Sequence, residues 1–349
     1  MAKYWSKALF YNERRNGFWA SAFLTGLLVK TPLIDMISNL NHLKDAYERG
    51  LLTGSDWGRW FGEMLLLGNG GMLIVALIIV GWLVLYQFRD SRQEAAGDLM
   101  ASMPFTRRQI IFTKWVTGVM AIAVPFVVIF LLLTVFYWVN TEWISTPFRL
   151  LPQWATLYFL FLACFYSFMF FVQTVMGHPG IASVIGVICT MIPWYLLSAI
   201  PVILRQLLGL NYGDAALLDG IERLGEYTVW TRWVRPRYEY LFPDWTTHQL
   251  IYTHYGLKVI SMVAVIVLFY WLAQQAYAKN PLEKNGKLLM FRFLEPVLIW
   301  GFAVCLGMLI VFLFGLGYGS GFFGLVLYLV AGTAIGYWLA KKAVLYYQG

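Results

Sequence analysis

The chain has 349 residues, of which 60% are hydrophobic and only 13% are charged, and its formal net charge is +8. Soluble domains carry roughly 25% charged residues, so this composition excludes an ordinary soluble protein and makes lipid the solvent for much of the surface. A charge of +8 would suggest a nucleic-acid partner in a soluble protein. No nucleic acid is expected here, because the basic residues cluster in the connections between apolar segments.

The hydrophobic segments predict an all-α polytopic membrane protein. Residues 1–16 form an amphipathic start, and a stretch of about 20 mostly apolar residues can then cross a bilayer as a helix. Eight spans are expected in chain order, near residues 17–40, 62–86, 114–138, 153–175, 180–203, 256–273, 296–315 and 321–340.

The distribution of lysine and arginine predicts the orientation of these spans. Cytoplasmic connections carry an excess of these residues. The larger share lies in the N-terminal segment, in residues 87–114, in the connection that follows residue 278, and at the C-terminus. Both termini are therefore predicted to be cytoplasmic, in a multi-pass protein of the bacterial plasma membrane. The opposite face then holds an external region over residues 204–255, whose alternating aromatic and basic residues are expected to lie on the outer membrane surface.

The connection over residues 87–114 has the most informative pattern. Ser91 and Glu94 have the spacing of a capping box, in which a serine caps a helix start and a glutamate reaches back to it. One apolar stripe follows, made by Ala95, Ala96, Leu99, Met100 and Met103. Pro104 ends the helix, and a second capping box, Thr106 with Gln109, opens the next span. A short helix over residues 91–103 is predicted, either as a mechanical contact or as a surface helix that rests on lipid headgroups.

This connection resembles the cytoplasmic loop of ABC-2 type permeases, the membrane subunits of one class of ATP-binding-cassette (ABC) transporters. The residues that carry the resemblance are Glu94, Gly97, Leu99, Met103, Pro104, Phe105, Thr106, Arg107 and Lys114. The sequence departs from the family pattern over residues 98–101, where a fuller Leu-Leu pattern is common, and at Met103, where leucine is frequent. The order of spans agrees over roughly residues 1–275.

The resemblance implies a fold and a domain organisation. Residues 1–16 are similar to the family's elbow helix, and residues 17–275 to its six-helix, type V exporter-like core with a coupling helix at 91–103. Residues 276–349 add two transmembrane helices, an extension similar to that of the acetoin-linked Ytr subgroup.

The resemblance also implies partners. The chain would form a dimer with a second copy or a homologous permease, embedded in membrane lipid, on two ATP-binding-cassette ATPase subunits that hold ATP and magnesium. It would act as an exporter (efflux). The residues expected to contact the ATPase are Ser91, Arg92, Glu94, Gly97, Leu99, Met100, Met103, Pro104 and Arg107.

The chain carries no recognisable catalytic motif of its own. The phosphate-binding pattern GxxxxGK[ST] is absent, as are HExxH, GxSxG and SxxK. No catalytic residue, cofactor or metal is therefore assigned to this chain. Ionisable residues at membrane depth are candidates for function, and Lys30 and Asp35 in the first span are predicted to line a pathway.

Two other classes of protein remain open on the sequence. An ion-driven secondary transporter or channel would need several acidic or histidine residues in mid-span and broken helices in related halves. A membrane enzyme would need clustered His, Asp, Glu or Ser at one membrane face. The substrate cannot be deduced from these residues.

Overall fold

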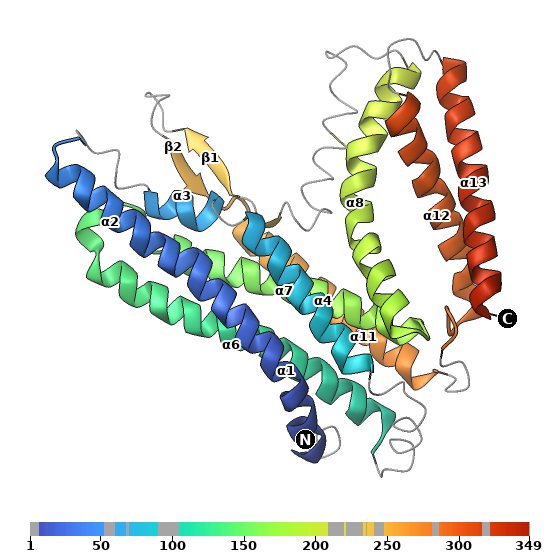
Figure 1. Ribbon diagram of the computed structural model, residues 1–349, viewed down its shortest axis with the longest axis horizontal. Coiled ribbons are helices and arrows are strands. Elements are labelled where there is room, and N and C mark those ends of the chain that lie inside the picture. The colour runs from blue at the N-terminus through green and yellow to red at the C-terminus, as the bar shows by residue number, and fades with distance from the viewer. Residues whose placement is uncertain are drawn as a thin grey trace. The chain divides into compact units, whose positions relative to one another are not determined.

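The computed structural model describes residues 7–51, 60–67, 70–89, 105–208, 220, 233–234, 236–240, 248–280, 286–315 and 322–348. Long helices dominate these residues (Figure 1). Eight segments are long and apolar enough to cross a membrane: Gly17–Glu48, Trp60–Arg89, Arg107–Val139, Leu150–Val175, Pro179–Pro201, Tyr255–Ala278, Arg292–Phe314 and Phe322–Tyr347. They confirm the eight predicted spans and the polytopic helical fold.

The elements follow the order of the spans. They are α1 (Lys7–Leu28), η1 (Val29–Ile34), α2 (Asp35–Glu48), α3 (Trp60–Leu67), α4 (Gly70–Arg89), α6 (Arg107–Val139), η4 (Thr141–Trp143), α7 (Leu150–Val175), α8 (Pro179–Leu208), β1 (Arg237–Tyr240), β2 (His248–Ile251), α11 (Tyr255–Ala278), η6 (Arg292–Leu294), α12 (Glu295–Ile310), η7 (Val311–Gly315) and α13 (Phe322–Gln348). The chain divides into two compact units. Unit 1 comprises Met1–Phe171 and Trp233–Ala278, and unit 2 comprises Val172–Arg232 and Lys279–Gly349.

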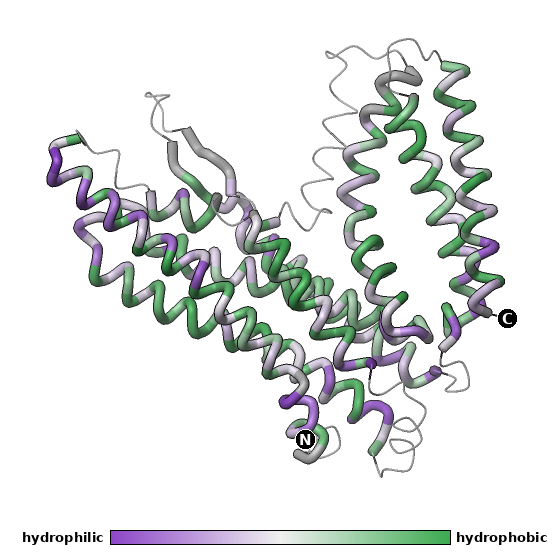
Figure 2. The backbone as a smooth tube through the Cα atoms, in the orientation of Figure 1, coloured by the Kyte–Doolittle hydropathy of each residue, from purple (hydrophilic) through white to green (hydrophobic). Residues whose placement is uncertain are grey.

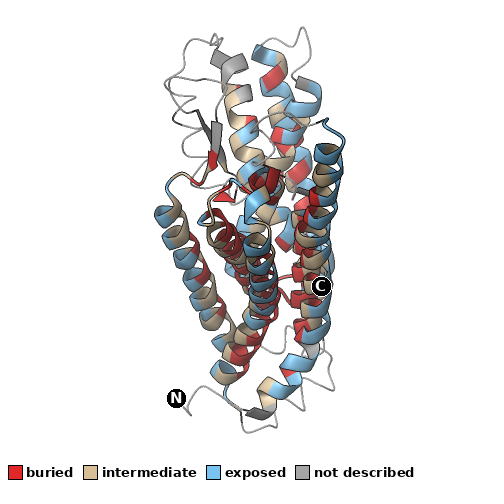
Figure 3. Cartoon of the chain, turned by 90° about the vertical axis from the view of Figure 1, so that its left-hand side faces the viewer, coloured by how far each residue is buried: buried red, intermediate tan, exposed pale blue. Residues whose placement is uncertain are grey.

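Burial is distributed as expected for helices in lipid. Of the apolar stretch of α7, 78% is buried, against 36% or less in each of the other spans. The long helices turn apolar side chains outward, such as Val124, Leu131 and Val135 on α6, which are more than half exposed. Figure 2 shows the apolar character of these helices, and Figure 3 the exposed residues along them. Surfaces of this kind suit contact with acyl chains, because water would penalise so large an apolar area.

The first helix is longer than the predicted span. α1, η1 and α2 follow one another without a break from Lys7 to Glu48. α2 is polar towards its end (Figure 2), and His42, Asp45 and Glu48 are exposed on it. The predicted boundary near residue 40 assumed that a polar sequence would end the helix. A helix that has left the lipid needs no apolar residues to continue, so α2 extends to Glu48, beyond the predicted span.

The two ends of unit 1 differ in chemistry. At one end α4 finishes with Arg89 and α6 begins with Arg107, and both arginines are exposed; we call this the basic end. We call the opposite end, which holds α2, α3, η4 and the strands, the hairpin end. There the Trp60 indole donates to the Trp143 carbonyl at 2.9 Å, and the Gly62 amide donates to Thr146 Oγ1 at 3.2 Å. These bonds join α3 to the loop that follows α6.

A two-stranded hairpin was not predicted. β1 and β2 pair antiparallel, with Arg237 opposite Ile251 and Tyr240 opposite His248. Sequence analysis placed this stretch on the membrane surface, although an alternation of residue types with period two is typical of a strand. The hairpin leads into Tyr252, whose pKa is raised by burial and, to a lesser degree, by nearby Tyr158. Most of the remaining external region 204–255 lies outside the described residues.

Small residues let two helices of unit 2 pack closely. A Cβ atom on Gly336 of α13 would lie 2.8 Å from Ala303 Cα of α12, and one on Gly332 would lie 2.9 Å from Gly307 Cα. Both distances are too short for any side chain larger than hydrogen. Such close approach of backbones is the usual way in which helices associate in lipid, where no hydrophobic effect drives them together.

The segment before α12 is joined to the end of α7. Met176 and Leu289 form an antiparallel bridge, and the Met290 amide donates to the Val175 carbonyl at 3.0 Å. Leu288, Leu289 and Met290 are all buried. The two C-terminal helices are therefore anchored by backbone bonds within unit 2.

Candidate coupling site

Most of the predicted coupling residues fall outside the described residues. They are Ser91, Arg92, Glu94, Gly97, Leu99, Met100, Met103 and Pro104, and their roles stay predictions. The structure describes the two helices that flank them, α4 up to Arg89 and α6 from Arg107. The candidate site is therefore built from the residues at these two helix ends.

The start of α6 confirms the second predicted capping box. Gln109 N donates to Thr106 Oγ1 at 3.3 Å, and Thr106 N donates to Gln109 Oε1 at 2.9 Å. This reciprocal pair satisfies two amides that the helix itself leaves unbonded. The capping box makes Thr106 the N-cap of α6, directly after the predicted coupling segment.

Arg107, the one predicted coupling residue that is described, contacts another helix. Its Nη1 donates to the carbonyl of Ala278, the last residue of α11, at 3.3 Å. A cation at the C-terminus of a helix is favoured, because the unbonded carbonyls there carry partial negative charge. About two turns further on, Trp115 of α6 lies against Tyr270 of α11, with ring centroids 4.6 Å apart. The start of α6 is thus attached to α11 at two points.

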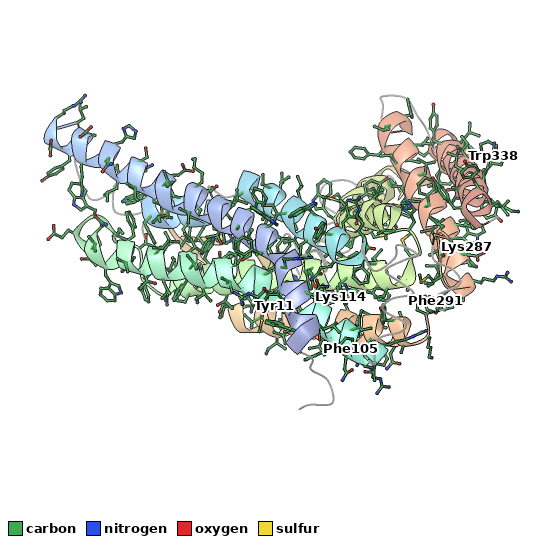
Figure 4. The ribbon with its side chains drawn as sticks, turned by 60° about the horizontal axis from the view of Figure 1, so that its bottom comes forward. Tyr11, Phe105, Lys114, Lys287, Phe291 and Trp338 are labelled. Carbon is green, nitrogen blue, oxygen red and sulfur yellow. The ribbon has the colours of Figure 1, made fainter. Side chains whose placement is uncertain are left out.

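Lys114 of α6 forms a buried ion pair at the basic end (Figure 4). Its Nζ lies 2.6 Å from Glu13 Oε1 of α1 and 2.7 Å from the Gln87 carbonyl of α4, and it donates to both. The side chains of Lys114 and Glu13 are each only 2% exposed. Lys114 Nζ also lies 5.9 Å from the centroid of the Phe88 ring, within the range of a cation–π interaction. One ammonium group therefore joins three helices.

The helices are joined a second time through Gln87. Its Nε2 donates to the Lys114 carbonyl at 3.1 Å, and Tyr166 of α7 donates from its hydroxyl to Gln87 Oε1 at 2.9 Å. The same hydroxyl lies 3.1 Å from the Lys114 carbonyl. We call Glu13, Gln87, Lys114 and Tyr166 the polar clamp. It links α1, α4, α6 and α7 at the end where the predicted coupling segment leaves and re-enters unit 1.

The energetics of the clamp favour one arrangement of the helices. Removing one partner from a buried ion pair costs about 3–5 kcal/mol, because the other charge remains buried and uncompensated. Replacing both partners by apolar residues of similar size is often neutral for stability. Glu13 Oε2 has no hydrogen-bond partner among the described residues. The pair is therefore better suited to specifying geometry than to adding stability.

Lys30 and Asp35, the predicted pathway residues, lie in a different setting. Lys30 Nζ is 2.5 Å from Asp35 Oδ1, and the two side chains are 64% and 38% exposed. They pair with each other across η1, within one helix. Their role in lining a pathway stays a prediction.

Sequence reasoning missed the polar clamp because it treated Lys114 as a charge at the boundary of the third span. The capping box at Thr106 starts that helix earlier, so Lys114 falls on its buried face with Ile110, Thr117 and Ala121. A lysine on a buried face needs an acidic partner. Glu13 is the only acidic residue before Asp35 in the sequence, and that signal could have identified the pair.

Comparison with known proteins finds one similar family. Residues 61–214 match the sequence model of one family, described as ABC-2 family transporter protein. No curated protein and no solved structure matches the chain. The matched residues hold α3, α4, α6, α7 and α8, and so include both helices that flank the predicted coupling segment. The Ytr subgroup stays a prediction. Residues 61–214 are therefore similar to the ABC-2 transporter family, in a chain whose eight long apolar helices are those of a multi-pass membrane protein.

Proposed function

We propose that the chain is the transmembrane permease subunit of an ATP-driven exporter, with ATP hydrolysis in separate ABC ATPase subunits. The coupling segment over residues 91–103 docks on one of these subunits, and the chain pairs with a second copy or a homologous permease. It resides in the bacterial plasma membrane with both termini and the basic end in the cytoplasm, where basic residues are favoured. ATP and magnesium belong to the partner, and this chain has no catalytic residue.

The observation that carries the proposal is the position of the polar clamp. Lys114 and Gln87 lie close to the two points at which the proposed coupling segment joins α6 and α4. A force on that segment reaches these two helix ends first. The clamp connects the same two helices to α1 and α7, the most buried span. These contacts would transmit a displacement of the coupling segment to α1 and α7.

An ion-driven transporter is the alternative, and Glu13 and Lys114 would then be its proton-carrying groups. Two ion pairs of the described residues are Lys30–Asp35 and Glu13–Lys114. Neither accompanies a chain of acidic or histidine residues through a span. We therefore favour an ATP-driven transporter.

The test is to purify the chain from its native membrane in mild detergent and to identify the proteins that accompany it by mass spectrometry. The wild type is compared with a Glu94→Ala, Leu99→Asp double variant. The matched control is Asn41→Ala, Asp45→Ala on the exposed face of α2. The proposal predicts a stoichiometric ABC ATPase with the wild type and the control, and its loss from the Glu94, Leu99 variant. A well-folded chain recovered alone in all three cases would contradict the proposal and favour the ion-driven transporter.

A further inference from the structure

The helix from Lys7 to Glu48 is tied to unit 1 very differently at its two ends. Near its start Glu13 is buried against Lys114. At its far end Tyr47 and Trp143 meet edge to face with ring centroids 5.6 Å apart, and Lys44 Nζ lies 5.7 Å from the Trp143 ring centroid. The first contact is a short ion pair between buried side chains. The second is an aromatic contact in which the Tyr47 side chain is exposed. The first contact is the more directional, because a short bond between buried charges tolerates little movement of the helix along its own axis.

Packing sets the resting position of α1 in unit 1, since Leu24 and Leu28 of this helix are fully buried. α1 and α6 approach most closely at Gly17, where a Cβ atom would lie 3.3 Å from Ala121 Cβ. Small residues form a smooth contact that allows backbones to come close. At this level small residues resist separation of the helices more than displacement along their axes. A directional bond nearby opposes such a displacement when a force acts on one of the helices.

The Glu13–Lys114 bond is of this kind. Lys114 Nζ donates at 2.6 Å to α1 and at 2.7 Å to α4, so axial sliding of either helix against α6 breaks a bond in a buried site. Tyr166 can bond Gln87 only because α6 carries glycine at position 118; a Cβ there would overlap the tyrosine ring. The four helices are thus held in one register at the basic end.

We infer that Glu13 and Lys114 are positioning residues that make α1, α4 and α6 move as one rigid body when the ATPase engages the coupling segment. This inference rests on the proposed function, because it assigns a role to the clamp during ATP-driven movement. Without the clamp, a push on residues 91–103 would move α4 and α6 and leave α1 behind. With the clamp, α1 carries the movement to the end of α2, roughly 50 Å along the helix from Glu13.

The experiment measures the distance between α1 and α6 by double electron–electron resonance. Spin labels are placed at Tyr11→Cys on α1 and Val128→Cys on α6, both exposed, with the three native cysteines replaced by alanine. The contact between Gly17 and Ala121 sets the labels roughly 20 Å apart along the axes. The complex with its co-purified ATPase is measured without nucleotide and after trapping with ATP and vanadate, with bound ADP–vanadate confirming the trapped state.

The variant is Glu13→Gln with Lys114→Met, which removes both charges and so leaves no buried charge unpaired. The matched control is Lys30→Met with Asp35→Asn, which removes the other ion pair of the same helix. The wild type and the control should give one distance that trapping does not change. The Glu13, Lys114 variant should give that same distance and the same thermal midpoint before trapping, and a shifted distance maximum after it. A merely structural role would alter the distance before trapping.

Two results would overturn the inference. One is a trapped Glu13, Lys114 variant that keeps the wild-type distance, because packing at Gly17 would then suffice. The other is a wild-type distance that changes on trapping, because the helices would then not move together. If the Lys114→Met double variant does not fold, Glu13→Gln with Lys114→Gln also leaves no buried charge unpaired, keeps polar side chains at both positions and should show a smaller shift in the same sense. A wild type that carries no ATPase would instead refute the proposed function, and this inference with it.

Discussion

Gly118 lies where the ring of Tyr166 crosses α6, and no other residue fits there. A Cβ atom at this position would overlap the tyrosine hydroxyl and ring. Gly118→Ala should therefore push Tyr166 away from Gln87 and lower the free energy of unfolding by about 1–3 kcal/mol, as overpacking usually does. Thermal unfolding in detergent measures the effect. Gly26→Ala on the exposed face of α1 is the control and should be close to neutral, since nothing lies within 4 Å of its Cβ.

A double-variant cycle separates this clash from a general loss of helix packing. Tyr166→Ala removes the ring that a new methyl group at Gly118 would meet. The Gly118→Ala, Tyr166→Ala protein should lose less stability than the sum of the two single losses, because contacting residues are not additive. Strict additivity would show that Gly118 does not accommodate the Tyr166 ring.

Single residues were the hardest features to predict from the sequence. The capping box at Thr106 was predicted correctly because its two partners are three residues apart and bond locally. The Glu13–Lys114 pair joins residues 101 positions apart, and no local pattern reports such a contact. Lys114 was assigned to a connection because charge usually marks the membrane boundary. Its burial follows from tertiary packing, which supplies Glu13 and the Gln87 carbonyl as partners.

Among the secondary-structure elements, α12 and α13 pack closely because small residues lie where they meet. Gly336→Leu would place a side chain against the Ala303 backbone. It should separate the two helices and lower the free energy of unfolding by about 1–3 kcal/mol. The matched control is Gly301→Leu on α12, whose Cβ has nothing within 4 Å. Thermal unfolding in detergent would contradict this account if both leucine variants lost equal stability.

Most helices could be predicted because their signal is simple. A span needs an apolar stretch of about 20 residues, and the described part of the chain contains eight. The hairpin Arg237–Ile251 was missed, since two strands of four residues give only a short pattern. The length of the first helix was underestimated, because hydropathy reports where a helix leaves lipid and not where it ends.

At the scale of the whole molecule, the family match and the eight spans describe a membrane transport component. The sequence analysis reached this conclusion from the pattern over residues 91–107 and the order of the spans. Neither the substrate nor the direction of transport has a signature in these residues, because in the proposed function both depend on a pathway formed with partner subunits. Coupling to an ATPase is the claim on which the rest of the account depends.

The most direct test of that claim is site-specific photo-cross-linking in intact cells. A benzoylphenylalanine replaces Leu99 in the proposed coupling segment, and in a second strain it replaces His42 on the exposed face of α2. The account predicts that irradiation joins the chain to an ABC ATPase through position 99 and not through position 42, since the proposed coupling segment connects the two helices that meet it at the basic end, and His42 lies on α2 towards the hairpin end. An ATPase adduct at position 42, or none at position 99 in a well-folded protein, would contradict it.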